Sequence, residues 1–171
     1  MKIKLTEKQL FYLIKEEFKE NIQPTFVVYL MVGLPGSGKS TWCKNHIPNV
    51  PIISRDIIRA ELGYTKSSEE KAVLSKEQEQ KVTDVEYSRI EDFCRKKIDF
   101  AIDDTNIGRF RKGLIDNLRK FGAYIIGVNL QTPLETCIER RKNDIPPQAM
   151  EKIYQRMISL DPNEVDKVIN I

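Results

Sequence analysis

Residues 25–40 decide the fold, and they read Thr-Phe-Val-Val-Tyr-Leu-Met-Val and then Gly-Leu-Pro-Gly-Ser-Gly-Lys-Ser. The first eight are β-branched, aromatic or aliphatic without alternation, which is typical of a strand buried on both faces of a parallel sheet. The next eight match the phosphate-binding pattern G-x-x-x-x-G-K-[S/T]. Because the motif follows a buried strand and opens a helix, we expect it to bind phosphate rather than to form an ordinary Gly-rich turn.

Apolar strand segments and helical segments alternate along the rest of the chain. Strands are expected at residues 25–32, 51–54, 98–103, 123–130 and 165–171, and helices at residues 56–62, 67–97, 109–121, 133–142 and 148–159. In the long 67–97 segment, a sparse apolar face is expected from Val82, Val85, Tyr87, Ile90 and Phe93. This alternation predicts an α/β fold, a doubly wound parallel sheet of about five strands flanked by helices.

The N-terminal segment reads as a separate helix. Thr6 and Gln9 form a capping-box pattern, apolar residues recur at helical spacing to Glu20, and Pro24 ends the segment. We therefore expect a helical appendage over residues 1–24, joined to one domain over residues 25–171.

The composition excludes several classes of protein. The 171 residues, 40% of them hydrophobic, suffice for one domain with a core, and a net charge of +3 permits a nucleic-acid partner without requiring one. Three cysteines without C-x-x-C spacing disfavour a disulfide scaffold, and the single histidine, His46, excludes a His-rich zinc site. With no apolar run of 18 residues, we expect a cytoplasmic protein with no membrane partner. The sequence leaves open whether the chain forms homo-oligomers.

The glycine-rich loop predicts a nucleoside triphosphate site with Mg²⁺. Its backbone amides and the start of the following helix favour phosphate oxygens. Lys39 is expected to reach the β- and γ-phosphates, and the Ser40 hydroxyl to bind Mg²⁺. The residues predicted to bind the nucleotide are Gly33, Pro35, Gly36, Ser37, Gly38, Lys39, Ser40 and Thr41.

Two polar segments that follow strands are candidates for binding the molecule that accepts the phosphate. Asp56 and Arg59 lie one helical turn apart after the second strand, where a carboxylate can accept a proton from an alcohol and an arginine can hold an anion. A helix N-cap with a surface arginine is the alternative. Asp103 and Asp104 follow the third strand, and by pattern either one suits a metal-binding aspartate while the other caps the next helix.

A cationic helix end precedes Pro146 and Pro147. Arg140 and Arg141 there suit a lid that closes over the triphosphate and stabilises transition-state charge. The alternative is that these cations only complement the C-terminus of their own helix.

Three segments together resemble the kinase domain of phage-type polynucleotide 5′-kinases. They are Gly33 to Trp42, the R-D-x-x-R element from Arg55 to Arg59, and Asp104-Thr105-Asn106, within a similarity over roughly residues 25–171. The resemblance implies a P-loop kinase domain with a C-terminal helical lid, and transfer of phosphate from ATP to the 5′-hydroxyl of DNA or RNA, single-stranded ends included.

The resemblance also implies roles for individual residues. Asp56 corresponds to the general base, Arg59 to the arginine that contacts the acceptor phosphate, and Arg140 to the first lid arginine, so that Asp56, Lys39, Arg59 and Arg140 form the catalytic set. Asp104 and Ser40 correspond to the metal-binding residues. Thr105 and Asn106, with Asp56 and Arg59, correspond to the residues that bind the acceptor.

The sequence departs from the family in two ways. Asp144 stands where the family has a second lid arginine, for which Arg141 or Lys142 is a substitute, and no D-x-D-x-T phosphatase motif occurs. The chain is thus expected to be a kinase alone or a kinase domain of a longer protein. The lysines at positions 66, 71, 76 and 81 fit either an acceptor-side wall or a solvated face.

Two other functions remain open at this point. A kinase for a small metabolite, a nucleoside or a tRNA-linked substrate would use the same P-loop. A nucleotide-gated regulatory protein would hydrolyse ATP slowly without an acceptor. No N-K-x-D string for guanine recognition is present, which disfavours GTP.

Overall fold

The computed structural model describes residues 25–64 and 74–171. The expected appendage over residues 1–24, its helix, and the first part of the expected 67–97 helix lie outside the described residues. Within the described part, none of the helices has the length and apolar character that a membrane-spanning segment needs.

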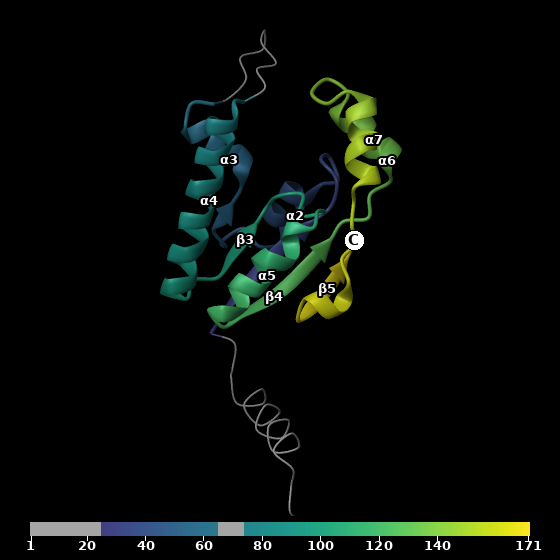
Figure 1. Cartoon of the computed structure of the whole chain (residues 1–171). Coiled ribbons are helices and arrows are strands. Elements are labelled where there is room, and N and C mark those ends of the chain that lie inside the picture. Colours follow the sequence, from purple (N-terminus) through teal and green to yellow (C-terminus); the bar gives the residue numbers. More distant parts are fainter. Residues whose placement is uncertain (1–24, 65–73) are drawn as a thin grey trace, which may run out of the picture.

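Five strands form one parallel sheet with the order β2-β3-β1-β4-β5 (Figure 1). The strands are β1 (Phe26–Val32), β2 (Ile52–Ile53), β3 (Phe100–Ile102), β4 (Ala123–Asn129) and β5 (Lys167–Asn170). The predicted doubly wound α/β fold is confirmed. Because β1 is central and its neighbours β3 and β4 lie in opposite directions of strand order, the crevice at the carboxyl end of β1 is the expected ligand site.

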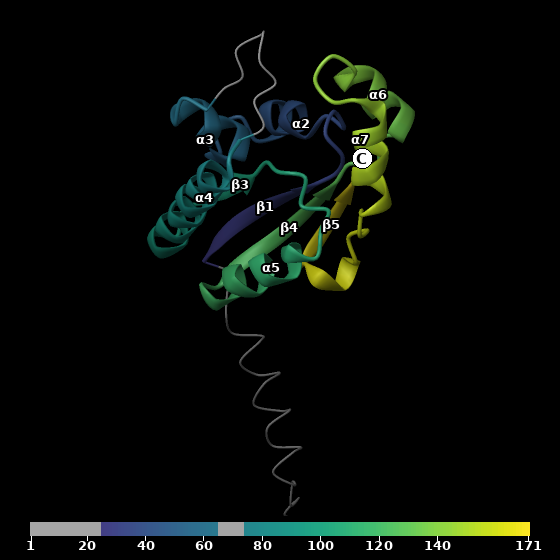
Figure 2. The ribbon, with the colours of Figure 1, turned by 45° about the horizontal axis from the view of Figure 1, so that its top comes forward.

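Helices cover both faces of the sheet. They are α2 (Lys39–His46), α3 (Arg55–Glu61), α4 (Lys76–Lys96), α5 (Phe110–Lys120), α6 (Leu134–Arg141) and α7 (Pro147–Gln155), with a short 3-10 helix η1 (Pro162–Glu164). In Figure 2, α4 and α5 lie against the sheet, while α6 and α7 lie beyond the edge that carries β5.

Two hydrophobic clusters lie on opposite faces of the sheet because successive β1 side chains alternate. Val28 and Leu30 join the larger cluster with residues of α4 and α5, whereas Met31 packs against Trp42 and Cys43 of α2. All seven β1 side chains are buried or half-buried, as the unbroken apolar run predicts.

Most boundaries differ from the sequence expectation by one or two residues, and three of the differences have a clear local reason. α4 begins at Lys76 because Ser75 and Gln78 form a reciprocal capping box. It ends at Lys96, and because the next residue, Lys97, has a left-handed backbone (φ 56°), β3 begins only at Phe100. α7 ends at Gln155, four residues early, and the chain beyond it turns so that the amide of Ile158 donates to the carbonyl of Ile107.

Tyr87 was expected on the apolar face of α4, and this expectation was wrong. Val82 and Ile90 are buried and Val85 and Phe93 pack against the core, but Tyr87 is 47% exposed.

Candidate active site

The P-loop connects β1 to α2 and is shaped by its glycines. Gly38 caps α2 with a positive φ of 101°, and Gly36 has a φ of 82°. Both values lie in the left-handed region, which glycine adopts at little cost. The first amides of α2 have no partner within the helix and form an electropositive end that favours an anion.

Lys39 lies inside this loop. Its ammonium donates to the carbonyl oxygens of Gly33 (3.1 Å) and Leu34 (2.8 Å), and the residue is 9% exposed. Burial lowers the pKa of Lys39, an effect opposed by the nearby carboxylates of Asp103 and Asp104. The lysine is therefore positioned as a cation at the base of the phosphate site.

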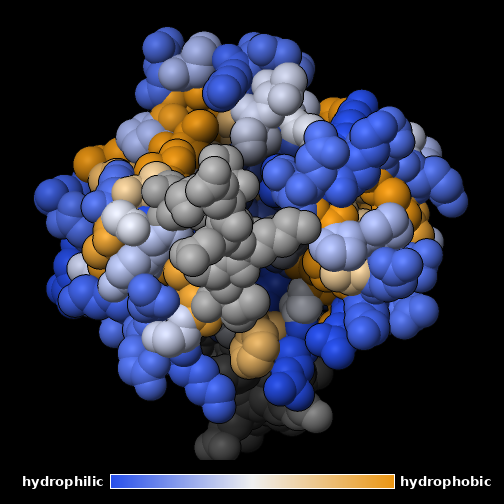
Figure 3. All heavy atoms as spheres, turned by 90° about the horizontal axis from the view of Figure 1, so that it is seen from above, coloured by the Kyte–Doolittle hydropathy of each residue, from blue (hydrophilic) through white to orange (hydrophobic). Residues whose placement is uncertain are grey.

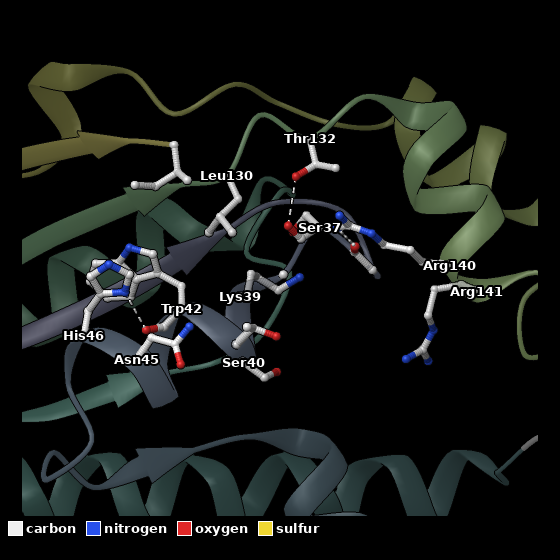
Figure 4. Close-up of a pocket in the computed structure, with 14 residues that line it drawn as sticks. Ser37, Lys39, Ser40, Trp42, Asn45, His46, Leu130, Thr132, Arg140 and Arg141 are labelled. Atoms are coloured by element: carbon white, nitrogen blue, oxygen red, sulfur yellow. Dashed lines mark hydrogen bonds between the residues drawn. The ribbon is translucent and has the colours of Figure 1, made fainter.

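A cavity of about 570 Å³ runs from the P-loop along α2 (Figure 4). Trp42, Asn45 and His46 project into it from α2, with the rings of Trp42 and His46 stacked 4.7 Å apart. Seven of the P-loop and helix-start residues predicted from the sequence lie in or beside it: Gly36, Ser37, Gly38, Lys39, Ser40 and Thr41 line the wall, and Gly33 receives the Lys39 hydrogen bond. We call it the donor cavity.

The helix α6 contacts the P-loop directly. Arg140 Nη1 donates to the carbonyl of Gly36 at 3.0 Å, and a side chain at Gly36 would meet Arg141 Cγ at 2.8 Å. Figure 4 shows Arg140 reaching from α6 to the loop, with Arg141 beside it. Arg141 is also 3.5 Å from Asp144, the residue at the second lid position, so the two side chains form an ion pair.

A second cavity, of about 590 Å³, lies on the other side of Lys39 and Ser40. Its walls include the predicted acceptor residues Asp56 and Arg59 and the metal candidates Asp103 and Asp104, together with Pro35, Gly36, Thr105 and Arg141. We call it the acceptor cavity. Arg141 lines both cavities, whereas Arg140 lines only the donor cavity.

Asp56 in the first turn of α3 pairs with Arg59 in the last turn of the same helix. Arg59 donates to Asp56 at 2.8 Å and holds Glu79 of α4 through two nitrogens, each at 3.2 Å. The side chain of Asp56 is 84% exposed. Asp56 therefore has an open carboxylate, while Arg59 is fixed between two acids.

Arg55 connects α3, α4 and the end of β3. Its guanidinium binds Glu79 and Glu86, each at 2.8 Å, and its amide donates to Asp104 at 3.2 Å. Burial alone would raise the pKa of Glu79, but the hydrogen bonds from Arg59 and Arg55 outweigh it and lower that pKa. Glu79 and Glu86 were not assigned any role from the sequence.

Asp104 lies beside Glu86 at the floor of the acceptor cavity. Burial raises the pKa of Asp104 to about 8, and the neighbouring Glu86 carboxyl adds to the rise while Arg55 opposes it. Two carboxyl groups in one partly buried site favour holding a proton between them.

Mg²⁺ fits the donor set at this floor. Asp103 Oδ1 and Asp104 Oδ2 are buried without a hydrogen-bond partner among the described residues, and the Ser40 hydroxyl lines the same cavity. No group of three or more His, Cys, Asp or Glu forms a metal cage in the described part of the chain. Such a set suits Mg²⁺, which usually takes one or two carboxylates and completes its sphere with phosphate oxygens and water.

The Asp104-Thr105-Asn106 segment is held against β1. Gly33 donates its amide to the carbonyl of Thr105 at 3.0 Å, and the Asn106 amide nitrogen donates to the carbonyl of Met31 at 2.9 Å. Asn106 has a left-handed φ of 46°. Thr105 lines the acceptor cavity, but Asn106 does not, so its acceptor-binding role stays a prediction.

The face of α4 toward the acceptor cavity is acidic. Glu79, Thr83 and Glu86 point to Arg55 and Arg59, whereas Lys76 and Lys81 are exposed. These two lysines do not line the acceptor cavity, and whether they contact an acceptor or only solvent stays a prediction. Lys66 and Lys71 lie outside the described residues. The spacing 79, 83, 86 was the signal in the sequence that these three residues share one helix face.

A family model described as an AAA domain matches residues 28–144. The match covers more than half of the chain, from β1 through the P-loop and Asp56 to the end of α6. The chain belongs to this family. Its domain is of the P-loop kinase type, a fold that binds nucleotide.

Solved structures support the fold. A chain in the structure of the Pnkp1/Rnl/Hen1 RNA repair complex is 23% identical with a TM-score of 0.67, covering 81% of this chain and 46% of that chain. This domain thus spans about half the length of that protein. A putative kinase from Chloroflexus aurantiacus is 14% identical with a TM-score of 0.66, covering 86% of this chain and 88% of that chain. Kti12 of Chaetomium thermophilum, in complex with ADP-AlF3, is 15% identical with a TM-score of 0.54, covering 84% of this chain and 88% of that chain.

Proposed function

We propose that this chain transfers the γ-phosphate of ATP to the 5′-hydroxyl end of a DNA or RNA strand. The observation that carries the proposal is the acceptor cavity, which has Lys39 and Ser40 of the P-loop on one wall and Asp56 and Arg59 on another. A phosphate bound at the loop and a hydroxyl beside Asp56 would meet in this one cavity. The R-D-x-x-R and D-T-N elements make a polynucleotide the favoured acceptor.

The reaction follows from these positions. Asp56 orients the 5′-hydroxyl and accepts its proton while a bond forms between that oxygen and the γ-phosphorus. The bond from the γ-phosphorus to the β–γ bridging oxygen breaks, and ADP leaves. Lys39 of the P-loop and the α6 arginines Arg140 and Arg141 stabilise the charge on the oxygens of the transferred group. Bound Mg²⁺, held by Ser40 and the Asp103–Asp104 carboxylates, would neutralise charge on the β- and γ-phosphates.

The nucleotide would extend into the donor cavity. Lys39 must exchange its carbonyl partners for phosphate oxygens when the triphosphate binds, a change that its flexible side chain permits. The base would then lie toward Trp42 and His46, where the cavity continues along α2.

A small-molecule acceptor is the second candidate, and the acidic wall favours it. Glu79, Glu86 and Asp104 place carboxylates near the acceptor cavity, and carboxylates suit sugar hydroxyls better than a phosphate-rich strand. In the polynucleotide reaction Arg55 and Arg59 offset this charge, because both pair with Glu79.

Transfer from γ-labelled ATP to 5′-hydroxyl DNA and RNA oligonucleotides tests the proposal. Asp56→Asn should lower transfer on the order of 10²–10⁴-fold, the range of general base catalysis, while ATP binding is retained. Asp84→Asn is the matched control and should leave the rate unchanged, because Asp84 is an exposed aspartate of α4 whose one hydrogen-bond donor among the described residues is Gln80. If the native chain binds ATP but labels neither oligonucleotide, nucleosides and sugars become the acceptors to assay.

A further inference from the structure

A third cavity, of about 740 Å³, adjoins the acceptor cavity between α4, α5 and α7. The two cavities share Arg55, Asp104 and Thr105 in their walls. A molecule bound with one end beside Asp56 can therefore continue past Asp104 and Thr105 into this space. We call it the α4–α5–α7 groove.

Aromatic side chains flank this groove over an apolar floor. Ile90, Leu114 and Ile153 lie along the floor. Tyr87 on α4 and Phe110 at the start of α5 line the same space, and they are 47% and 75% exposed. Isolated exposed apolar residues are ordinary, but two aromatics flanking one hollow mark a binding surface.

Cations accompany the aromatics. The Arg109 guanidinium lies 5.1 Å from the centre of the Phe110 ring, a cation–π contact, and Arg156 lines the groove without an ion pair to any described residue. Arg111 also lines the groove, but its guanidinium is already bound to Glu164 and to three backbone carbonyls. The carboxyl groups of Glu86 and Asp104 lie at the end of the groove toward Arg55.

We propose that the α4–α5–α7 groove binds the bases of the acceptor strand, stacked on Tyr87 and Phe110, with Arg109 and Arg156 near its phosphates. The inference rests on the proposed function and deepens it, because it names the acceptor as a single strand of more than one nucleotide. Aromatic faces with neighbouring cations are the elements by which proteins hold single strands with little sequence preference. The same elements in a groove continuous with Asp56 point to the acceptor rather than to ATP, whose cavity lies beyond the P-loop.

Direct binding tests the groove independently of phosphate transfer. The probe is a 3′-fluorescein-labelled 5′-hydroxyl octathymidylate, and its counterpart has abasic sites at its first three nucleotides. Phe110→Ala and Tyr87→Ala should each raise the Kd for the probe about tenfold, the usual weight of one stacked base. Phe110→Trp should preserve the Kd, and the Kd of the abasic strand should not respond to any of these changes.

Tyr154→Ala is the matched control. Tyr154 is an aromatic residue of α7 with 51% exposure that lines a different cavity, so its loss should leave binding of the probe unchanged. Since Phe110, Tyr87 and Tyr154 are all exposed, the three variants should melt at similar temperatures and bind ATP alike.

The outcomes separate the groove from the proposed function. If the native chain transfers phosphate and the Phe110 and Tyr87 variants bind and phosphorylate the strand equally well, the groove proposal is wrong and the kinase proposal is supported. If the strand binds and Phe110→Ala weakens that binding, but the strand accepts no phosphate, the groove proposal is supported and the kinase proposal is wrong. The groove proposal is also wrong if the Phe110 and Tyr87 variants lose affinity for the abasic strand as much as for the probe. It is wrong as well if the native chain binds no strand at all, and a protein segment would then be the ligand to test.

Discussion

Gly36 lies where the P-loop and α6 touch, so one hydrogen atom in place of a side chain decides how closely the two pack. A Cβ at this position would lie 2.8 Å from Arg141 Cγ and 3.1 Å from the carbonyl oxygen of Cys137. The second distance is to backbone, which cannot move without shifting α6. The residue therefore sets the distance between the phosphate site and the lid arginines.

Gly36→Ala should weaken ATP binding at least tenfold and destabilise the domain by about 1–2 kcal/mol, the usual cost of a left-handed alanine. Gly63→Ala is the control, because Gly63 also has a positive φ, of 72°, but no atom of the described residues lies within 4 Å of its Cβ position. It should have a similar stability cost and normal ATP affinity. Calorimetric titration with ATP and urea denaturation measure both quantities; unchanged ATP affinity in Gly36→Ala would contradict this account of the loop.

Asp104 should make stability depend on pH. Its pKa of about 8 in the folded chain lies above the ordinary value of 3.8, so between these values the folded state keeps a proton that the unfolded state has released. The stabilisation is complete below pH 4 and is lost as the pH rises toward 8, on the order of 1 kcal/mol per pH unit at most.

Urea denaturation at pH 5, 7 and 9 without divalent cations measures this effect. Asp104→Asn cannot titrate, so the native chain should lose stability relative to the variant between pH 5 and 9. Stability curves that run parallel for the two proteins would show that Asp104 ionises normally.

At the scale of elements, α3 lines one side of the acceptor cavity and is held there by α4, and the end of α6 lines another. The helix α4 contributes the acids that hold Arg55 and Arg59 in place, and α6 contributes Arg141. The helices α4 and α6 reach the site from opposite ends of the sheet order, near β2 and beyond β5, and Figure 1 shows them on either side of the strands. Figure 3 looks down on this end of the molecule, where hydrophilic side chains cover most of the described surface.

Arg140→Ala should lower the rate of transfer on the order of 10²-fold while the KM for the acceptor stays within about twofold, because a charge that stabilises the transition state acts on kcat. Arg140 reaches the loop through its hydrogen bond to Gly36. Lys142→Ala is the control, since among the described residues Lys142 pairs with Glu139 on the same helix end and lines neither cavity. Steady-state kinetics measure kcat and KM for each variant. A change confined to the melting temperature would mean that Arg140 only stabilises the C-terminal end of its own helix.

At the scale of the whole molecule, Arg111 joins segments far apart in the sequence. It is 4% exposed, and its guanidinium binds Glu164 and the carbonyls of Asn106, Ile158 and Ser159. The D-T-N segment, the chain after α7 and the 3-10 helix before β5 are thus held by one side chain. A buried charge with a full set of partners is costly to disrupt.

Arg111→Ala should destabilise the domain by about 3–5 kcal/mol, because Glu164 and three carbonyls lose their shared partner. Arg119→Ala is the control: Arg119 is a half-exposed arginine of the same helix, 3.8 Å from Asp166, and its loss should cost under about 1 kcal/mol. Urea unfolding at pH 7 compares them. Similar midpoints for the two variants would mean that Arg111 contributes no more than a surface ion pair.

The apolar runs and the P-loop motif alone predicted the parallel sheet, the position of every described strand to within about two residues, and the place of the phosphate site. These features depend on residues adjacent in sequence: an unbroken apolar run can only be buried on both faces, and G-x-x-x-x-G-K-S dictates a turn of fixed shape. The chemical roles of Asp56, Arg59 and Asp104 stay predictions that the experiments above test.

Only the tertiary structure decided which face of each helix meets the site. The sequence placed Tyr87 on the apolar face of its helix and gave Glu79 and Glu86 no role in the site, yet Tyr87 flanks the groove and the two acids hold Arg55. Helical periodicity indicates that a face exists but not what packs against it, because its neighbours come from strands and loops distant in sequence. Which charges pair, and which pKa values shift, depends on those long-range contacts, and they exist only once the sheet has brought α3, α4 and α6 together around the end of β1.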